Sequence, residues 1–208
     1  MSFEERLQGA YGRLLREASA HFEGKSSVYQ TLLNLAQRLD EEGISYAVIG
    51  GMALGRHGYA RMTEDVDVLM TVEGLATFRA QCVGKGYLPA FAGASKTFRD
   101  TETQVRIEII TAGEYPGDGK PKSVVFPDPI EASVEVEGVR VVTLDKLIEL
   151  KLASGISAPH RLRDLADVQD LISILSLPAD FANRLDESVR SEYRRLWQSV
   201  QDTQSPAD

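Results

Sequence analysis

Apolar residues in the first part of the chain recur at helical spacing. Phe3, Leu7 and Tyr11 begin one such pattern, and a second apolar stripe runs over 28–39. Ser26 or Ser27 is a suitable N-cap for the second helix, and Gly43 is a suitable stop. We therefore interpret 1–43 as N-terminal helices that pack on a core.

The middle of the chain has short, β-prone runs separated by turn residues. These runs predict strands over 44–49, 65–70, 96–99, 104–110, 134–136 and 139–142, with helices over 52–57 and 75–83. The last third returns to helical periodicity and predicts helices over 144–153, 162–175 and 184–201. The order predicts an α+β fold, with a mixed-sheet core over 44–142, a helical part over 143–202 and a tail over 203–208.

Composition narrows the class of protein. The chain has 208 residues, of which 43% are hydrophobic and 26% are charged, as is typical of a globular domain. Its net charge of −8 argues against a non-specific nucleic-acid coat but not against a local basic patch. The acidic start, the lack of a long apolar run and the single Cys82 favour a cytoplasmic protein without a membrane helix or an internal disulfide.

The stretch from Tyr46 to Met70 carries the candidate chemistry. A buried strand runs into Gly50-Gly51, and glycines at such a turn allow a ligand to approach the main chain. Fourteen residues after Gly51 comes Asp65-Val66-Asp67. Alternate residues of a strand share one face, so both carboxylates face the same point. A hard divalent cation such as Mg²⁺ prefers such ligands together with substrate phosphates.

Glu108 is a candidate third acid. It lies in a β-prone run between Ile107 and Ile109, whose side chains point the other way. If its strand lies beside the Asp65–Asp67 strand, three carboxylates meet and can hold two metal ions. Otherwise Glu108 is the solvent-facing position of an edge strand.

These residues in this order resemble the nucleotidyltransferase superfamily of the DNA polymerase beta type. The longer string Gly50-Gly51-Met52-Ala53-Leu54, followed by Arg61-x-Thr63-x-Asp65-Val66-Asp67, resembles the minimal branch that contains the AbiEii-type toxins. The segments 147–153 and 163–168, with Lys151, Asp164 and Asp167, are similar to the later Lys and Asp motifs of that branch. The third acid departs from the superfamily, where aspartate is frequent.

The resemblance implies transfer of a nucleoside monophosphate from a nucleoside triphosphate to an acceptor hydroxyl. Asp65, Asp67 and Glu108 are then the catalytic and metal-binding residues, with Mg²⁺, two ions, or Mn²⁺ as cofactor. Gly50, Gly51, Arg61, Thr63 and Lys151 bind nucleotide, and Asp164 and Asp167 support Lys151. The acceptor is RNA in a toxin-like reading, with a cognate antitoxin as partner, or an antibiotic-type small molecule.

Each residue also has a structural interpretation. Gly50-Gly51 can be a plain turn, Asp65 and Asp67 a solvated strand face, and Arg61 a surface charge. Lys151 can extend its stem along apolar residues to solvent, and Asp164 and Asp167 can be surface acids. A non-catalytic protein that keeps the fold, and a nuclease with the same carboxylates, are the other classes of function.

Overall fold

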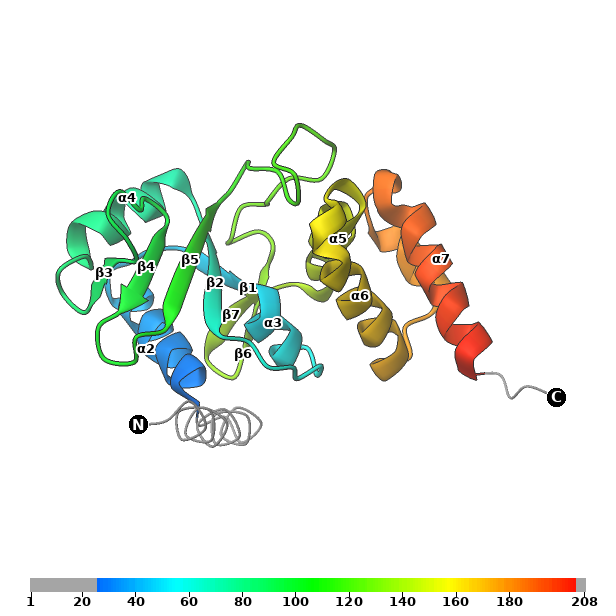
Figure 1. Cartoon of the computed structure of the whole chain (residues 1–208), viewed down its shortest axis with the longest axis horizontal. Helices are drawn as coiled ribbons and strands as arrows, with labels where there is room; N and C mark the ends of the chain where they lie inside the picture. Colours follow the sequence, from blue (N-terminus) through cyan, green and yellow to red (C-terminus); the bar gives the residue numbers. More distant parts are fainter. Residues whose placement is uncertain (1–25, 205–208) are drawn as a thin grey trace, which may run out of the picture.

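The computed structural model describes residues 26–204, so the helix expected around Phe3, Leu7 and Tyr11 lies outside the described part. The sheet part contains α2 (Ser27–Glu41), β1 (Tyr46–Ile49), α3 (Gly50–Arg56), β2 (Asp65–Met70), α4 (Val72–Gln81), β3 (Tyr87–Pro89), β4 (Thr97–Asp100), β5 (Arg106–Thr111), β6 (Ser133–Val136) and β7 (Val139–Val142). The helical part follows with α5 (Leu144–Ser157), α6 (Leu162–Ile174) and α7 (Glu187–Gln204), with 3₁₀ turns Pro159–Arg161 and Ala179–Arg184. Figure 1 shows the helical part beside the sheet.

One mixed seven-stranded sheet organises the molecule, in the order β3-β4-β5-β2-β1-β7-β6. Strand β2 pairs with β1 in antiparallel fashion and with β5 in parallel fashion. The β2–β5 register places Asp65 beside Arg106 and Asp67 beside Glu108. The α+β fold expected from the sequence is therefore confirmed, and β2 is an internal strand.

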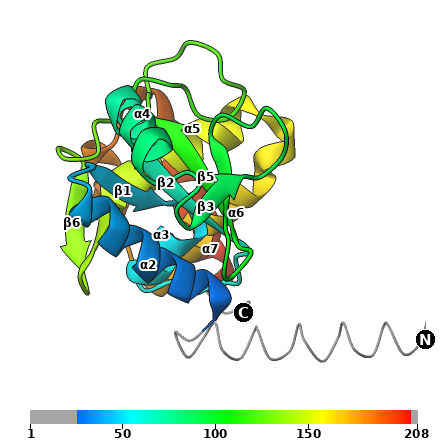
Figure 2. The same ribbon diagram turned by 90° about the vertical axis from the view of Figure 1, so that its left-hand side faces the viewer.

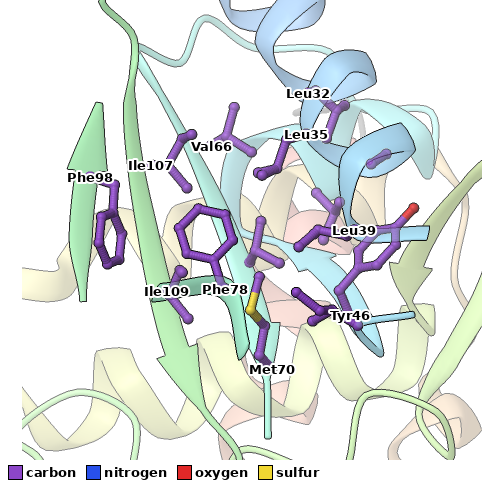
Figure 3. Close-up of a cluster of buried hydrophobic side chains, with 14 of the residues drawn as sticks. Leu32, Leu35, Leu39, Tyr46, Val66, Met70, Phe78, Phe98, Ile107 and Ile109 are labelled. Atoms are coloured by element: carbon purple, nitrogen blue, oxygen red, sulfur yellow. The ribbon is translucent and has the colours of Figure 1, made fainter. Parts of the chain in front are cut away.

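Each face of the sheet has its own core. On one face, α2 and α4 bury Leu32, Leu35 and Phe78 against Val66 and Ile107 of the sheet (Figure 3). Turned by 90°, the molecule shows α2 and α4 in front of the strands (Figure 2). On the other face, the helical part packs over β1, β2 and β7. Because burial of apolar area is the main stabilising term, the cores on both faces of the sheet stabilise the fold.

The second face is the one that carries the candidate site. Leu69 and Ile110 belong to the core on this face, and side chains alternate along each strand. Asp65 and Asp67 therefore share a face with Leu69, and Glu108 shares it with Ile110. On the β3–β4–β5 side of this face, Leu88, Arg99 and Arg106 are exposed.

Most expected elements are present, but two helix ends differ from the expectation and one strand was not expected. Helix α4 begins at Val72 rather than at 75, because Thr71 caps it by accepting a hydrogen bond from the Gly74 N–H (3.0 Å). Strand β3 was not expected, because Gly86 and Pro89 interrupt the β-prone pattern of this short edge strand. Helix α5 continues past the expected end at 153, because Gly155 lies against Leu165 of α6, where a Cβ would come within 2.5 Å of Leu165 Cγ.

The last helix also differs from the expectation. A 3₁₀ turn occupies Ala179–Arg184, and α7 begins at Glu187 and runs to Gln204, past the expected start of the tail at 203. Asp186 accepts a hydrogen bond from the Ser188 N–H (3.0 Å), which sets this start. Within residues 26–204, no helix has the length and apolar content that a membrane span requires.

Candidate active site

The two aspartates of β2 line a shared pocket from the site face of the sheet. Both are partly exposed, whereas the intervening Val66 is fully buried on the other face. Thr63 donates its hydroxyl hydrogen to Asp65 Oδ1 (2.9 Å). The loop before β2 therefore fixes the rotamer of the first carboxylate, and the alternation of β2 aims the second in the same direction.

Glu108 lies on the neighbouring strand, directly beside Asp67 in the register. It lines the same pocket as Asp65 and Asp67, so all three acids lie on one face. Its carboxylate, however, accepts a hydrogen bond from Arg106 at 2.7 Å, and about half of each side chain is exposed. Arg106 thus holds the third acid in an ion pair.

The glycine pair lies against the site residues themselves. Gly50 has φ of +64°, a left-handed conformation that favours glycine, and a Cβ there would overlap the carboxylate of Asp67. A Cβ on Gly51 would come within 2.8 Å of the Thr63 side chain. The turn is therefore more than a plain connection, because its two missing side chains leave room for Asp67 and Thr63.

Arg61 and Lys151 meet at one aspartate of α6. Asp167 is buried, and its Oδ2 accepts hydrogen bonds from Lys151 Nζ (2.7 Å) and from Arg61 Nη2 (3.1 Å). Arg61 Nε also lies 2.9 Å from Asp167 Oδ1 in the ion pair. Lys151 also donates to Asp164 Oδ1 (2.9 Å). These contacts join the loop before β2 to α5 and α6 through a buried network of charges.

This network is buried. The interpretation of Lys151 as a side chain that extends to solvent is wrong, because only 6% of the residue is exposed and α6 packs over it. Of the two interpretations of Asp167, the burial does not fit the surface acid, since 2% of the residue is exposed. A lysine at such depth requires its acidic partners, since an isolated buried charge costs several kcal/mol.

The carboxylates perturb one another. Burial, and then the charges of Asp65 and Glu108, raise the pKa of Asp67 from 3.8 to about 7, while Lys151 and Arg161 act in the opposite direction. In Asp164, burial also acts to raise the pKa, but the charge of Lys151 and hydrogen bonds from Ser154 and Lys151 outweigh it, so the pKa is lowered. The site thus combines acids that repel one another, at Asp65, Asp67 and Glu108, with Asp164, whose charge is balanced by Lys151.

Two cavities open at the aspartates. A pocket of about 190 Å³ lies between the acids and α5, and Ile110, Phe126 and Leu147 form the apolar part of its mixed wall. A wider groove of about 530 Å³ runs over Gly50 and Gly51, and Arg61, Arg161 and Arg163 line it. The groove therefore offers cations to a polyanion, and the pocket offers apolar surface to a flat or apolar group.

The donor set suits a hard divalent cation in part. Burial, and after it repulsion from Asp65 and Glu108, raise the pKa of Asp67, and a cation would relieve the repulsion. Asp65 and Asp67 supply the oxygen ligands that Mg²⁺ prefers. Within residues 26–204, however, no three acids, histidines or cysteines are already gathered as a metal site. Glu108 is instead held by a hydrogen bond from Arg106 (2.7 Å).

The structure adds residues that the sequence did not single out. Ser154 donates its hydroxyl hydrogen to Asp164 Oδ2 (2.7 Å), and Arg161 lines both cavities. Ser154 follows Lys151 by three residues on α5, a spacing that puts both on one helix face, and this is a usable signal. Arg106 precedes Glu108 by two residues on a strand, which is the corresponding signal for the ion pair.

Comparisons with known proteins support the fold. No protein-family model matches the chain, and no curated protein matches it. Among solved structures, ANT(2")-Ia in complex with adenylyl-2"-tobramycin is similar at 14% identity and a TM-score of 0.50, over 85% of this chain and 99% of that one. An antigenic nucleotidyltransferase-like protein from Paracoccidioides brasiliensis is similar at 17% identity and a TM-score of 0.50, over 84% and 87%. The chain therefore has a nucleotidyltransferase-like fold.

Proposed function

We propose that the protein transfers a nucleoside monophosphate from a nucleoside triphosphate to an acceptor hydroxyl. The observation that carries this proposal is the convergence of Asp65, Asp67 and Glu108 on one face of adjacent strands, beside a groove lined by arginines. Acids alone suit a metal, and cations alone suit an anion. Both together suit a metal-bound triphosphate.

Each site residue has a part in this reaction. Asp65 and Asp67 would hold Mg²⁺, which would neutralise charge on the phosphates. Gly50 and Gly51 admit the triphosphate close to the main chain, and Arg61 and Lys151 balance its charge. Thr63 keeps Asp65 in place. Asp164 and Asp167 orient Lys151 before nucleotide arrives, because both accept hydrogen bonds from its Nζ.

The chemical step forms one bond and breaks one. The acceptor hydroxyl oxygen attacks the α-phosphorus, the new P–O bond forms, and the bond to pyrophosphate breaks. Glu108, once released from Arg106, accepts the hydroxyl proton. Most of the rate gain then comes from positioning and electrostatics, because the phosphoryl group needs little covalent help from the protein.

The acceptor is proposed to be RNA, as in the AbiEii-type toxins, and an antitoxin partner remains part of this prediction. A small-molecule acceptor is the alternative, since the similar ANT(2")-Ia was solved with an adenylylated tobramycin. A protein that binds nucleotide without transfer is the second alternative. All three proposed functions use the groove for the triphosphate. They differ in whether an acceptor binds beside Glu108 and, if so, in whether it is RNA or a small molecule.

The test is Mg²⁺-dependent pyrophosphate release with each nucleoside triphosphate, with RNA or an aminoglycoside as acceptor. Asp65→Asn and Asp67→Asn are expected to abolish release and to keep the fold, because each keeps side-chain volume and removes a ligand. Asp170→Asn, an exposed acid of α6 that accepts a hydrogen bond from Tyr59, is the matched control and is expected to keep activity. Release at the wild-type rate from both site variants would contradict the metal site, and nucleotide binding without release from wild-type protein would favour the non-catalytic reading.

A further inference from the structure

A row of side chains crosses the site face of the sheet at the level of Asp65. In the register, Asp65 lies beside Arg106, Arg106 lies opposite Arg99, and Arg99 lies opposite Leu88. Successive strands are about 4.8 Å apart, so the row leads outward from the catalytic acids to the edge strand β3. Both arginines are exposed along it.

Two arginines directly opposite each other are unfavourable in a sheet. Glu108 compensates Arg106, whereas Arg99 donates Nη1 to the backbone oxygen of Gln104 (2.8 Å), a neutral partner that does not cancel its charge. The unfavourable pair lies immediately beside a candidate catalytic acid. Local conflicts of this kind are typical of functional sites, where a ligand supplies the missing charge.

Resting on the proposed function, we infer that Arg99 and Arg106 form the acceptor subsite for the phosphates of a single-stranded nucleic acid. The phosphate nearest the reacting hydroxyl binds Arg106, and the next phosphate along the strand binds Arg99 on the neighbouring β-strand. Guanidinium groups suit this task because they bind phosphate oxygens through paired N–H groups. A polycationic aminoglycoside would meet repulsion from the same two residues.

The subsite also links acceptor binding to the third acid. A phosphate that binds Arg106 competes with Glu108 for the same guanidinium. Release of Glu108 leaves its carboxylate beside Asp67, where the proposed reaction needs a proton acceptor. Arg106 is therefore a positioning residue that keeps Glu108 neutralised until an acceptor strand is present.

The test is an anisotropy titration of a labelled single-stranded RNA oligonucleotide with the full chain, without nucleoside triphosphate, over a range of salt. Arg99→Gln and Arg106→Gln are each expected to weaken binding about 3- to 10-fold and to lower the salt slope by about 0.7. Arg79→Gln removes an arginine that is also exposed, from α4 on the other side of the sheet, and wild-type affinity is expected. Wild-type affinity in both subsite variants, or an equal loss in Arg79→Gln, would overturn the inference.

Two further arms make the result specific. A free nucleoside monophosphate that competes as well as the oligonucleotide would overturn a strand-binding subsite. Glu108→Gln is expected to tighten RNA binding in the wild-type background, because it removes the carboxylate that competes with the RNA phosphate for Arg106. It should have a smaller effect in the Arg106→Gln background, because this exchange of partners needs both residues. Equal effects in the two backgrounds would refute the exchange. The binding assay needs no turnover, so RNA binding through the arginines without pyrophosphate release would contradict the proposed function alone.

Discussion

Gly50 lies so close to Asp67 that any β-carbon at position 50 would overlap the aspartate carboxylate. The backbone at Gly50 also has φ of +64°, which side-chain-bearing residues rarely adopt. The glycine and the acid therefore form one unit, although they are seventeen positions apart in the sequence.

Gly50→Ala is expected to lower the free energy of unfolding by about 1–2 kcal/mol from backbone strain, with a further loss from the overlap. It should also abolish pyrophosphate release by displacing Asp67. Chemical denaturation and the release assay measure the two effects. Gly55→Ala is the control within the same helix, because a Cβ there meets nothing within 4 Å and should stabilise by about 0.5–1 kcal/mol. An active, stable Gly50→Ala protein would contradict the role of this contact.

The raised pKa of Asp67 predicts an unusual pH dependence of stability without metal. Its pKa in the folded state, about 7, exceeds the ordinary 3.8, so the proton is bound more tightly in the folded protein. The resulting stabilisation is fully present below pH 3.8 and is lost as the pH rises through about 7. Asp67→Asn is expected to flatten the dependence of Tm between about pH 5 and pH 8.

Mg²⁺ should act in the opposite sense on the same dependence. Its binding displaces the proton from Asp67, so it should raise Tm more at about pH 8 than at about pH 5. The same measurement on Asp67→Asn serves as the reference. An identical pH profile in the wild-type and variant proteins, with and without Mg²⁺, would rule out this assignment.

Lys151→Met is expected to destabilise the fold by about 3–5 kcal/mol, because it removes the positive charge that pairs with the carboxylates of Asp164 and Asp167. Asp164→Asn in the same chain should restore part of the loss, which separates the charge effect from packing. Lys85→Met, at an exposed position, should stay within about 0.5 kcal/mol of wild type. Denaturation curves for the four proteins give the comparison, and a Lys151→Met protein as stable as wild type would show that the network contributes little.

Glu108→Gln is expected to lower the rate of transfer by about 10²- to 10⁴-fold while the affinity for nucleoside triphosphate stays near wild type. The amide cannot accept the hydroxyl proton, and Glu108 does not line the groove that contains Arg61, Arg161 and Arg163. Single-turnover kinetics and nucleotide titration separate the two quantities. Glu135→Gln, at an exposed position of β6, is the matched control. A loss of affinity without a loss of rate would move Glu108 from the chemical step to nucleotide binding.

The parts of the site that local sequence predicts are those that lie on one element. Asp65 and Asp67 share a face because a strand alternates, and the apolar Val66 and Val68 mark the strand as internal. The strand containing Glu108 was found for the same reason. That this strand lies beside β2 follows from the register of the sheet, which no local pattern contains. The ion pair between Glu108 and Arg106 depends on the side-chain rotamers, which the sequence does not contain either.

Burial was the quantity that the sequence predicted least well. Lys151 neighbours an apolar stripe, and a lysine in that place usually extends to solvent. Its burial depends on α6. Asp164 and Asp167 of this helix offset the cost of burying the lysine charge, and they reach Lys151 only when the two helices are packed together. Gly155 permits that packing, and its role becomes visible only against Leu165.

The sharing of Asp167 between Arg61 and Lys151 has a consequence for a chain that is still being synthesised. Arg61 is made more than a hundred residues before Asp167, and Lys151 precedes it by sixteen. A nascent chain that lacks α6 has both cations but not the acid that holds them. Because domains acquire structure as they emerge, the groove over Gly50 and Gly51 stays incomplete until α6 has left the ribosome.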